Sequence, residues 1–286
     1  MRPLSIVIPC HDGAALLSKT LAGIAAQGNV TKRIEIILVD NNSKTDSMES
    51  VHRRFMDVLN ITLIQQPRLR HPFSLCRARN MALRLTTADW ILSLDSDCIP
   101  DQGHLAAVLK IISSGDTASV YTGERVFISS ADITVADILH DALAMNSLKP
   151  IRSASNYRLP LDRRMPIMKQ LPNVSHPWAF MHAGNLLYPV AKAREIGGHD
   201  EAFDGHWGYE DAEFAYRIIT GGGCAPRFSS EMRVFHQEPT HVTSSDYKHK
   251  LDKRNNPNWV RACEAIPGFR EFKIEQFRDL GAEIII

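Results

Sequence analysis

The sequence predicts an α/β fold with a mostly parallel central sheet and helices on both of its faces. Through the first hundred residues, short apolar runs rich in β-branched side chains alternate with segments whose apolar residues recur at helical spacing. Such alternation is typical of βαβ units joined by right-handed crossovers. The length of 286 residues is enough for one large domain with a full-sized core.

The elements of the first hundred residues follow directly from this pattern. The first apolar run, LSIVIP, is stopped by Pro9, and the segment after it carries Leu17, Leu21 and Ile24 on one helical face. We expect strands at residues 4–9, 34–40, 61–66 and 88–97, and helices at residues 14–27, 46–59 and 74–86.

The rest of the chain is less regular. Residues 145–177 hold five prolines, six Lys or Arg residues and one acid, which indicates a long irregular excursion. Glycines close both of the helices expected after it. Outside the excursion we expect helices at residues 102–113, 189–198 and 208–223, and strands at residues 118–122 and within 231–239.

Charge and cysteine content disfavour several classes of protein. Lys and Arg number 33 against 32 Asp and Glu, so no basic excess indicates nucleic acid as a partner. The charged stretch at 248–258 is more typical of a solvated loop than of a nucleic-acid patch. The five cysteines are odd in number and never form a CxxC pair, which argues against a disulfide framework and suits a reducing cytoplasm. No apolar run approaches the ~18 residues of a membrane span, although peripheral membrane association stays open.

Three of the expected strands carry candidate site residues at or just past their ends, at the carboxyl edge of the sheet, which is where α/β sheets bind ligands. The sequence after the first strand is PCHDG, not the G-x-G-x-x-G of a dinucleotide-binding turn, so a nicotinamide cofactor is disfavoured. The residues at this edge are Pro9, His11, Asp40, Asp95 and Asp97.

The segment SLDSD places two acids close together. On an extended strand Asp95 and Asp97 would point the same way, with Ser96 between them. Two neighbouring acids beside an apolar strand both stay ionised most readily when a cation lies close to them. A hard divalent ion that also binds phosphate oxygens would be such a cation. The alternative is a solvated Asp-Ser-Asp turn.

A second acidic cluster lies in GHWGYEDAEF. Glu210 and Asp211 begin a helix, where the macrodipole favours negative charge, so helix stabilisation is one explanation. The preceding Trp207 and two glycines favour a sugar site, because a sugar ring packs on an aromatic face while its hydroxyls donate to carboxylates. His236, in VFHQEP, could add an imidazole to an oxygen-rich metal site, although a lone histidine is more often structural.

Taken in order, these motifs resemble those of family 2 inverting glycosyltransferases with the GT-A fold. The resemblance covers roughly residues 4–240 and is strongest to the transferase domains of bacterial chondroitin-type polymerases and, more distantly, to animal galactosyl- and N-acetylgalactosaminyl-transferases. The segments that carry it are LSIVIP, ILVDNNS, CRARNMAL, SLDSD, HAGNLLY, HWGYEDAEFAYRI and VFHQEP.

The resemblance implies an activity and an organisation. The chain would transfer N-acetylhexosamine, glucose, galactose or glucuronate from a UDP-sugar to a hydroxyl of a small molecule, glycan or peptide, with Mn²⁺ or Mg²⁺ as cofactor. The displacement would be direct and inverting. Residues 1–240 would form the GT-A domain, with a nucleotide-binding half at 1–100 and an acceptor and catalytic half at 101–240. Residues 241–286 would be an extension that packs on the domain and could act as a lid.

The resemblance also implies roles on the donor side. Pro9 and Asp40 would contact the nucleoside, with His11 stacking on the base. Arg79 would lie near the donor. Asp95 and Ser96 would contact the ribose and lie around the metal. Asp97, His236 and Asp95 would be the metal ligands.

On the sugar side, Gly184 and Asn185 would line the sugar pocket, and Trp207 and Glu210 would hold the sugar or the acceptor. Asp211 would be the general base, with a pKa raised by burial beside Trp207. Two positions depart from the family pattern: Tyr209 replaces the second glycine of WGGED, and Cys10-His11 replaces an aromatic residue.

Two other functions fit part of the pattern. A sugar-nucleotidyltransferase would also use paired acids and a metal, but it would need a glycine-rich basic loop after the first strand, and PCHDGAALL has none. An inactive module that only binds a nucleotide sugar is the alternative from outside the enzymes, although all the candidate catalytic positions carry competent residues.

Overall fold

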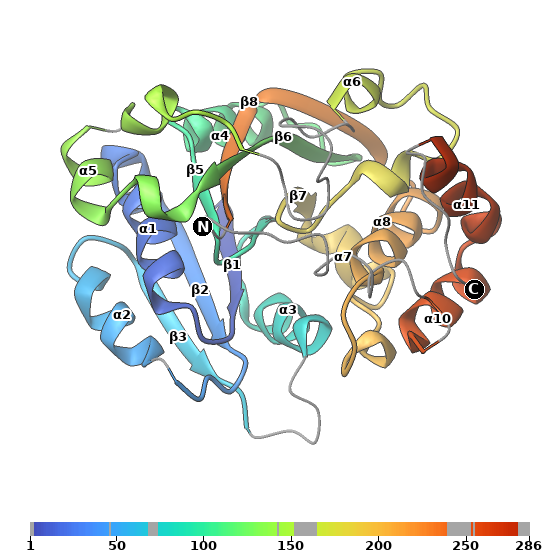
Figure 1. Ribbon diagram of the computed structural model, residues 1–286, viewed down its shortest axis with the longest axis horizontal. Coiled ribbons are helices and arrows are strands. Elements are labelled where there is room, and N and C mark those ends of the chain that lie inside the picture. Colours follow the sequence, from blue (N-terminus) through green and yellow to red (C-terminus); the bar gives the residue numbers. More distant parts are fainter. Residues whose placement is uncertain are drawn as a thin grey trace.

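The chain folds into one central sheet between two layers of helices, as the computed structural model in Figure 1 shows. The structure describes residues 3–45, 47–67, 74–141, 143–151, 165–238, 253 and 255–279. Within these ranges eight strands form the sheet, in the order β3-β2-β1-β4-β7-β6-β8-β5. Their bounds are β1 (Leu4–Cys10), β2 (Ile34–Asp40), β3 (Ile61–Gln65), β4 (Trp90–Leu94), β5 (Cys98–Pro100), β6 (Ser119–Ser129), β7 (Asn185–Pro189) and β8 (Ala225–Glu238).

The strands β3, β2, β1 and β4 are parallel to one another, and β6 is parallel to β8. The strand β7 pairs antiparallel with both β4 and β6, and β5 pairs antiparallel with β8. The expected α/β fold with a mostly parallel sheet is therefore confirmed. The α-helices in the described ranges are α1 (Ala14–Ala25), α2 (Met48–Phe55), α3 (Leu75–Leu85), α4 (His104–Ser113), α5 (Val135–His140), α6 (Met165–Met168), α7 (Val190–Glu195), α8 (Glu210–Thr220), α10 (Pro257–Ala265) and α11 (Phe269–Asp279).

Both faces of the sheet are buried, and the side chains of β1 show why. Leu4, Ile6 and Ile8 belong to one hydrophobic cluster, and Val7 belongs to the other. Successive residues of a strand point to opposite faces, so a continuous apolar run buries both sides. The first cluster lies under α1, α2 and α4, and the second under α3, α7, α8 and the C-terminal helices.

The strand expected at 88–97 ends earlier, at Leu94. Asp95 begins a tight turn closed by a hydrogen bond from the Cys98 amide to the Asp95 carbonyl (3.1 Å), and β5 follows. The extended geometry predicted for Asp95 and Asp97 is therefore wrong. The reason is tertiary, because Cys98 pairs with His236 of β8 at the far edge of the sheet.

Three other strands differ from expectation. β6 and β8 are longer than predicted because they pair with each other along most of their length, across a register shift between Gly123 and Arg125. β7 was not predicted, since NLLYP is only five residues long. Of the irregular excursion, 152–164 lie outside the described residues, and the described part contains α6 and short 3₁₀ turns.

The C-terminal helices α10 and α11 lie beside α8 at one end of the molecule (Figure 1). The rings of Trp259 and Phe269 contact each other and both contact Tyr209, the residue before α8. The domain boundary near residue 240 and the lid stay predictions, because residues 239–252 lie outside the described ranges. Among the described helices, none combines the length and the apolar character that crossing a bilayer requires.

Asn185 gives a first prediction. Its side chain is 5 % exposed, donates to the Met232 carbonyl (2.7 Å) and lies 3.1 Å from Nε2 of His104, so it links β7, β8 and α4. Replacing it with leucine leaves buried polar partners unsatisfied, so Asn185→Leu should lower the free energy of unfolding by about 1–3 kcal/mol. Urea unfolding measures this, with Ser113→Ala at the exposed end of α4 as the control. An unchanged free energy would contradict the structural role.

Candidate active site

The loops after β1 and β2 hold one group of expected residues together. Pro9 pairs with Val39, and the next pair in the register is Cys10 with Asp40. Oδ1 of Asp12 accepts the backbone N–H groups of residues 44 and 45, both at 2.8 Å, which ties the two loops. His11 contacts the same loop, with Nδ1 lying 2.8 Å from the carbonyl of residue 41.

Asp40 ends β2 and is buried. Its Oδ1 accepts hydrogen bonds from the amide (2.9 Å) and the hydroxyl (2.7 Å) of Ser43, so the carboxylate has a fixed orientation. The structure thus brings Pro9, His11 and Asp40 to adjoining strand ends, as the sequence predicts. Their contact with a nucleoside stays a prediction.

Arg79 connects the two acidic motifs. Its guanidinium, on a residue 2 % exposed, lies 3.4 Å from Asp95 Oδ1 and 3.7 Å from Glu210 Oε1. Asp204 fixes the start of α3 by accepting the amides of residues 76 (2.9 Å) and 77 (3.1 Å), and this places Arg79 one turn along the helix. A buried cation between two carboxylates holds both motifs at one location.

Gly184 and Asp95 are in close contact. The Asp95 amide donates to the Gly184 carbonyl at 3.3 Å, and a Cβ on residue 184 would lie only 2.5 Å from Asp95 Oδ2. A side chain at residue 184 would therefore require the Asp95 carboxylate to move away. Burial and the nearby charge of Asp97 raise the pKa of Asp95 above its usual value, although Arg79 opposes the shift.

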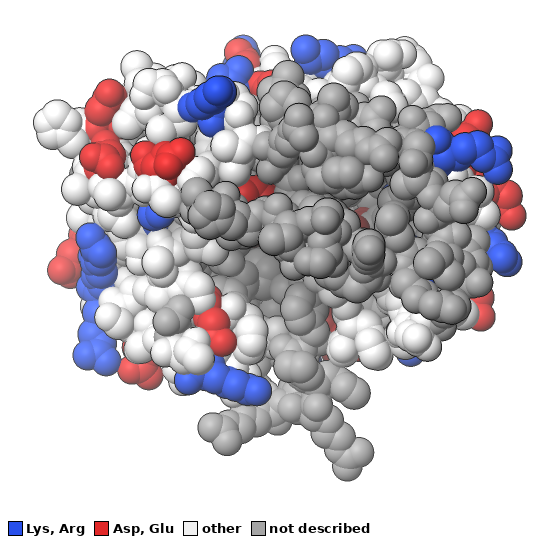
Figure 2. Space-filling view, viewed as in Figure 1, with Lys and Arg blue, Asp and Glu red and all other residues white. Residues whose placement is uncertain are grey.

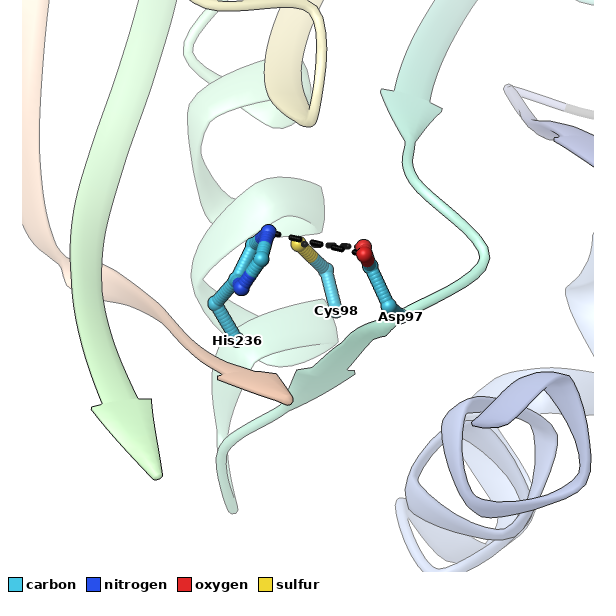
Figure 3. Close-up of side chains that lie close together, drawn as sticks. All are labelled: Asp97, Cys98 and His236. Atoms are coloured by element: carbon cyan, nitrogen blue, oxygen red, sulfur yellow. Dashed lines mark hydrogen bonds and ion pairs between the residues drawn. The ribbon is translucent and has the colours of Figure 1, made fainter. Parts of the chain in front are cut away.

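Asp97 and His236 converge with Cys98 on one small region (Figure 3). His236 Nε2 lies 3.5 Å from Asp97 Oδ2, and the three potential ligand atoms are all within 4.8 Å of one another. Burial raises the pKa of the Cys98 thiol well above its usual value, which favours the protonated sulfur while no metal is bound. The remaining carboxylate and imidazole fit a divalent ion such as Mn²⁺.

Asp95 is not part of that group in the structure, because its carboxylate contacts Arg79. Ser96 lies in the turn between the two acids, and its carbonyl accepts the Thr20 hydroxyl at 2.9 Å. Metal binding by Asp95 and ribose binding by Asp95 and Ser96 therefore stay predictions.

The sequence reasoning missed two residues beside this group. Glu238 is buried, and its Oε1 lies 3.5 Å from Nδ1 of His236, so it can orient the ring with Nε2 toward Asp97. The H-x-E spacing on a strand, which puts both side chains on one face, was the available signal. Arg125, in the unpredicted part of β6, lies close enough for its positive charge to lower the pKa of Asp97, against the larger effect of burial.

Glu210 and Asp211 begin α8 and have different partners. Glu210 faces Arg79, whereas Asp211 Oδ2 lies 2.8 Å from His182 Nδ1 and Oδ1 accepts the Ala212 amide at 2.8 Å. Burial and the charge of Asp211 raise the pKa of Glu210 to about 7. Burial alone would raise the pKa of Asp211, but the hydrogen bond from His182 and nearby positive charges lower it to about 2.

The expectation that burial raises the pKa of Asp211 is therefore wrong, because His182 was not recognised as its partner. Trp207 is 54 % exposed and presents its ring at the surface, as a sugar-stacking residue would. Asn185, expected in the sugar pocket, is instead hydrogen bonded within the fold, and its contact with a sugar stays a prediction.

The loop before α8 is held by the C-terminal part of the chain. The Asn258 side chain is 0 % exposed and donates to the carbonyls of residues 203 (2.9 Å), 206 (3.0 Å) and 208 (3.1 Å). Tyr209 follows with a φ of 74°, a left-handed conformation that favours glycine. The aromatic contacts of Tyr209 with α10 and α11 offset the cost of that conformation.

Among the residues that the structure describes, basic and acidic side chains are interspersed around the rim of the face shown in Figure 2. This agrees with the near-neutral net charge of +1.

Comparison with known families gives two matches along the chain. Residues 5–183 match the model of glycosyl transferase family 2, and residues 163–241 match the model described as the N-terminal domain of galactosyltransferase. The family resemblance predicted from the sequence motifs is confirmed.

Several characterised proteins are similar to this chain. The chondroitin synthase of Escherichia coli is 29% identical over 245 residues, which cover 82% of this chain and 35% of the synthase. The validoxylamine A glucosyltransferase of Streptomyces hygroscopicus is 28% identical over 225 residues, covering 77% of this chain and 52% of that protein. The chain thus spans about a third of the synthase and about half of the glucosyltransferase.

Solved structures with this fold include a mannosyltransferase from Pyrobaculum calidifontis in complex with GDP-Man and Mn²⁺. It aligns with a TM-score of 0.61 and 17% identity over 94% of this chain and 67% of its own. TarS of S. aureus in complex with UDP-GlcNAc aligns with a TM-score of 0.58 and 15% identity over 87% of this chain and 64% of its own. The expected GT-A fold is confirmed.

The raised pKa of Glu210 generates a prediction for the metal-free protein. Its folded-state pKa of about 7 lies above the ordinary 4.5, so the stability gained from its proton is present at low pH and lost as pH rises toward 7. Glu210→Gln removes this dependence. Its free energy of unfolding should therefore rise relative to the wild type between pH 5 and pH 8, by on the order of 2–3 kcal/mol.

Urea unfolding across that pH range measures the difference. The control is Glu264→Gln, an exposed position on α10, which should run parallel to the wild type. A Glu210→Gln curve that also ran parallel would show that Glu210 is ionised throughout.

Proposed function

The chain belongs to glycosyl transferase family 2, and we propose that it transfers a sugar from a UDP-sugar to an acceptor hydroxyl by single displacement with inversion, with Mn²⁺ or Mg²⁺ bound. The observation that carries the proposal is the convergence of Asp97 with His236, together with the Arg79 bridge from Asp95 to Glu210. These contacts support a divalent-ion site next to the acids that Arg79 links.

The donor nucleoside would bind at the ends of β1 and β2. Asp40, held by Ser43, would accept the N–H of the base, and Pro9 and His11 would line the same site. UDP is the proposed nucleotide because TarS, which shares the fold, has been seen with UDP and UDP-GlcNAc. The sugar would be N-acetylhexosamine, glucose, galactose or glucuronate.

The diphosphate would lie near Asp97 and His236, which would hold the metal, with Glu238 orienting the imidazole. A bound ion would neutralise charge that grows on the departing diphosphate. The fixed positive charge of Arg125, next to the same acids, would add to this stabilisation.

The acceptor would approach from the side of α8. Its hydroxyl oxygen forms a bond to the anomeric carbon, the bond from that carbon to the diphosphate breaks, and the hydroxyl proton moves to the Asp211 carboxylate. With a resting pKa of about 2, Asp211 is a weak base. The proton therefore moves only as the attacking oxygen becomes acidic in the transition state.

The sugars themselves would meet Trp207, Glu210 and the backbone at Gly184. The exposed ring of Trp207 offers a stacking face, and the absence of a side chain at Gly184 lets Asp95 come close to the same space. The acceptor class and a cytoplasmic location stay predictions.

The metal assignment is tested by UDP release. The wild type should slowly hydrolyse a UDP-sugar in the presence of Mn²⁺, and Asp97→Ala should lose this Mn²⁺-dependent activity, because it removes a carboxylate ligand. The control is Asp132→Ala, an exposed acid. A wild type that binds UDP-sugars without releasing UDP would favour the binding module. Full activity and metal response in Asp97→Ala would refute the ligand assignment.

The division of labour between the two acids is tested by isosteric amides. Asp211→Asn keeps the shape of the side chain but removes the base, so kcat should fall by about 10²–10⁴ while donor affinity changes little. Glu210→Gln should mainly raise the KM for the acceptor. The roles are reversed if Asp211→Asn keeps more than about a tenth of the wild-type kcat and Glu210→Gln is inactive.

A further inference from the structure

We propose that His182 is a positioning residue that holds Asp211 in place for deprotonation of the acceptor, an inference that rests on the proposed function. Nδ1 of His182 lies 2.8 Å from Oδ2 of Asp211, which is as short as the contact of this carboxylate with the neighbouring Ala212 amide. Neither residue lies on the other's element, since His182 precedes β7 and Asp211 begins α8.

The chemistry of the pair fixes its tautomer. An ionised carboxylate only accepts hydrogen bonds, so the proton of this contact belongs to Nδ1 of His182. Burial lowers the pKa of His182, against the opposing effect of Asp211, and the ring is therefore neutral at pH 7. Nε2 then carries no proton, and this buried atom has no hydrogen-bond partner among the described residues.

The two oxygens of Asp211 are fixed from two directions. Oδ2 accepts from His182, and Oδ1 accepts the amide of Ala212 at 2.8 Å. Two hydrogen bonds from different segments fix the plane of the carboxylate, and each oxygen keeps a second lone pair that could receive a proton. A base held in this way is oriented before the acceptor arrives, so less ordering is needed in the transition state.

The segment that carries His182 also reaches the donor side. Two residues further on, the Gly184 carbonyl accepts the Asp95 amide at 3.3 Å. The segment 182–184 therefore contacts Asp211, the proposed base, at one end and Asp95 at the other. Through it, the position of Asp211 is set relative to Asp95, which fixes the spacing of acceptor and donor.

His182 keeps its proton throughout the proposed reaction. The proton of the acceptor moves to Asp211, the acceptor oxygen bonds to the anomeric carbon, and the diphosphate leaves with the electron pair of the broken bond. If His182 itself took the proton, the proton would have to reach Nε2, the ring nitrogen that carries none, and that atom is buried.

Two variants of one residue test the proposal. The substitution His182→Asn places an amide N–H close to where Nδ1 donates and offers no basic nitrogen. His182→Leu removes the donor and keeps an apolar side chain. The measurement is kcat for UDP release from UDP-GlcNAc and UDP-glucose with Mn²⁺, with water as the acceptor, alongside the Kd for UDP by calorimetry.

We expect His182→Leu to lower kcat by about 10–100-fold with little change in the Kd for UDP, because the base is displaced while the donor site is intact. His182→Asn should keep kcat within a few fold of the wild type. Retained UDP affinity shows in both variants that the protein is folded.

Other outcomes overturn the proposal. Wild-type kcat in His182→Leu would show that the contact does not position the base. Equal losses in His182→Asn and His182→Leu would show that a basic ring nitrogen is required and that His182 takes the proton itself.

Nitrogen NMR of the imidazole tests the contact without activity. A wild type that releases no UDP from any UDP-sugar of the proposed donor classes would refute the proposed function, and the NMR signal of the ring would still report on the pair of His182 and Asp211. The proposal predicts a neutral ring protonated at Nδ1, with a signal that shifts in Asp211→Asn. A proton on Nε2 would overturn it.

Discussion

The buried guanidinium of Arg79 is the constraint on which the rest of the site depends. It lies between Asp95, at the end of the parallel half of the sheet, and Glu210, at the start of α8. Removing a charge from water is costly unless opposite charges surround it, so these acids and Arg79 hold one another in place. The same crowding of acids raises the pKa of Glu210 to about 7, because burial is joined by the second negative charge of Asp211. A site in which several carboxylates lie close together is stabilised when a divalent cation binds among them.

The fold supplies this constraint from several distant segments. Asp204 caps α3 and so places Arg79, and Asn258 of α10 holds the loop that leads into α8. Asn258 does so by donating to three backbone carbonyls, so the C-terminal helices contribute to the geometry of the site as well as to its covering. The left-handed backbone at Tyr209 is kept by ring contacts with those helices. The chain thus uses an aromatic anchor where the family pattern has a glycine.

The parallel half of the fold could be predicted from the sequence, because β1 and β2 are local apolar runs that bury both faces of the sheet. The position of Asp40 at the end of β2 could be predicted as well, since a strand end is a local feature. Asp97 lies in the turn after β4 and His236 within β8, and the prediction for both comes from the motifs SLDSD and VFHQEP. The turn at Asp95 could not, because it depends on the pairing of Cys98 with a strand more than a hundred residues away. Nor could the partner of Asp211, because a single histidine in HAGNLLY carries no signal until the fold brings it to α8. Contacts to backbone carbonyls, such as those of Asn258, leave no side-chain pattern to recognise.

The central claim is that the carboxyl edge of the sheet binds a nucleoside diphosphate together with a divalent ion. It is tested most directly by the thermal midpoint of the wild-type protein with UDP, with and without Mn²⁺ and with Mn²⁺ removed by a chelator. A ligand that binds only the folded state at about 100 times its Kd adds about 2.7 kcal/mol of stability by mass action. The account predicts that UDP raises the midpoint and that Mn²⁺ increases this shift, with the increase lost on chelation. A midpoint unmoved by UDP in the presence of Mn²⁺ would contradict it.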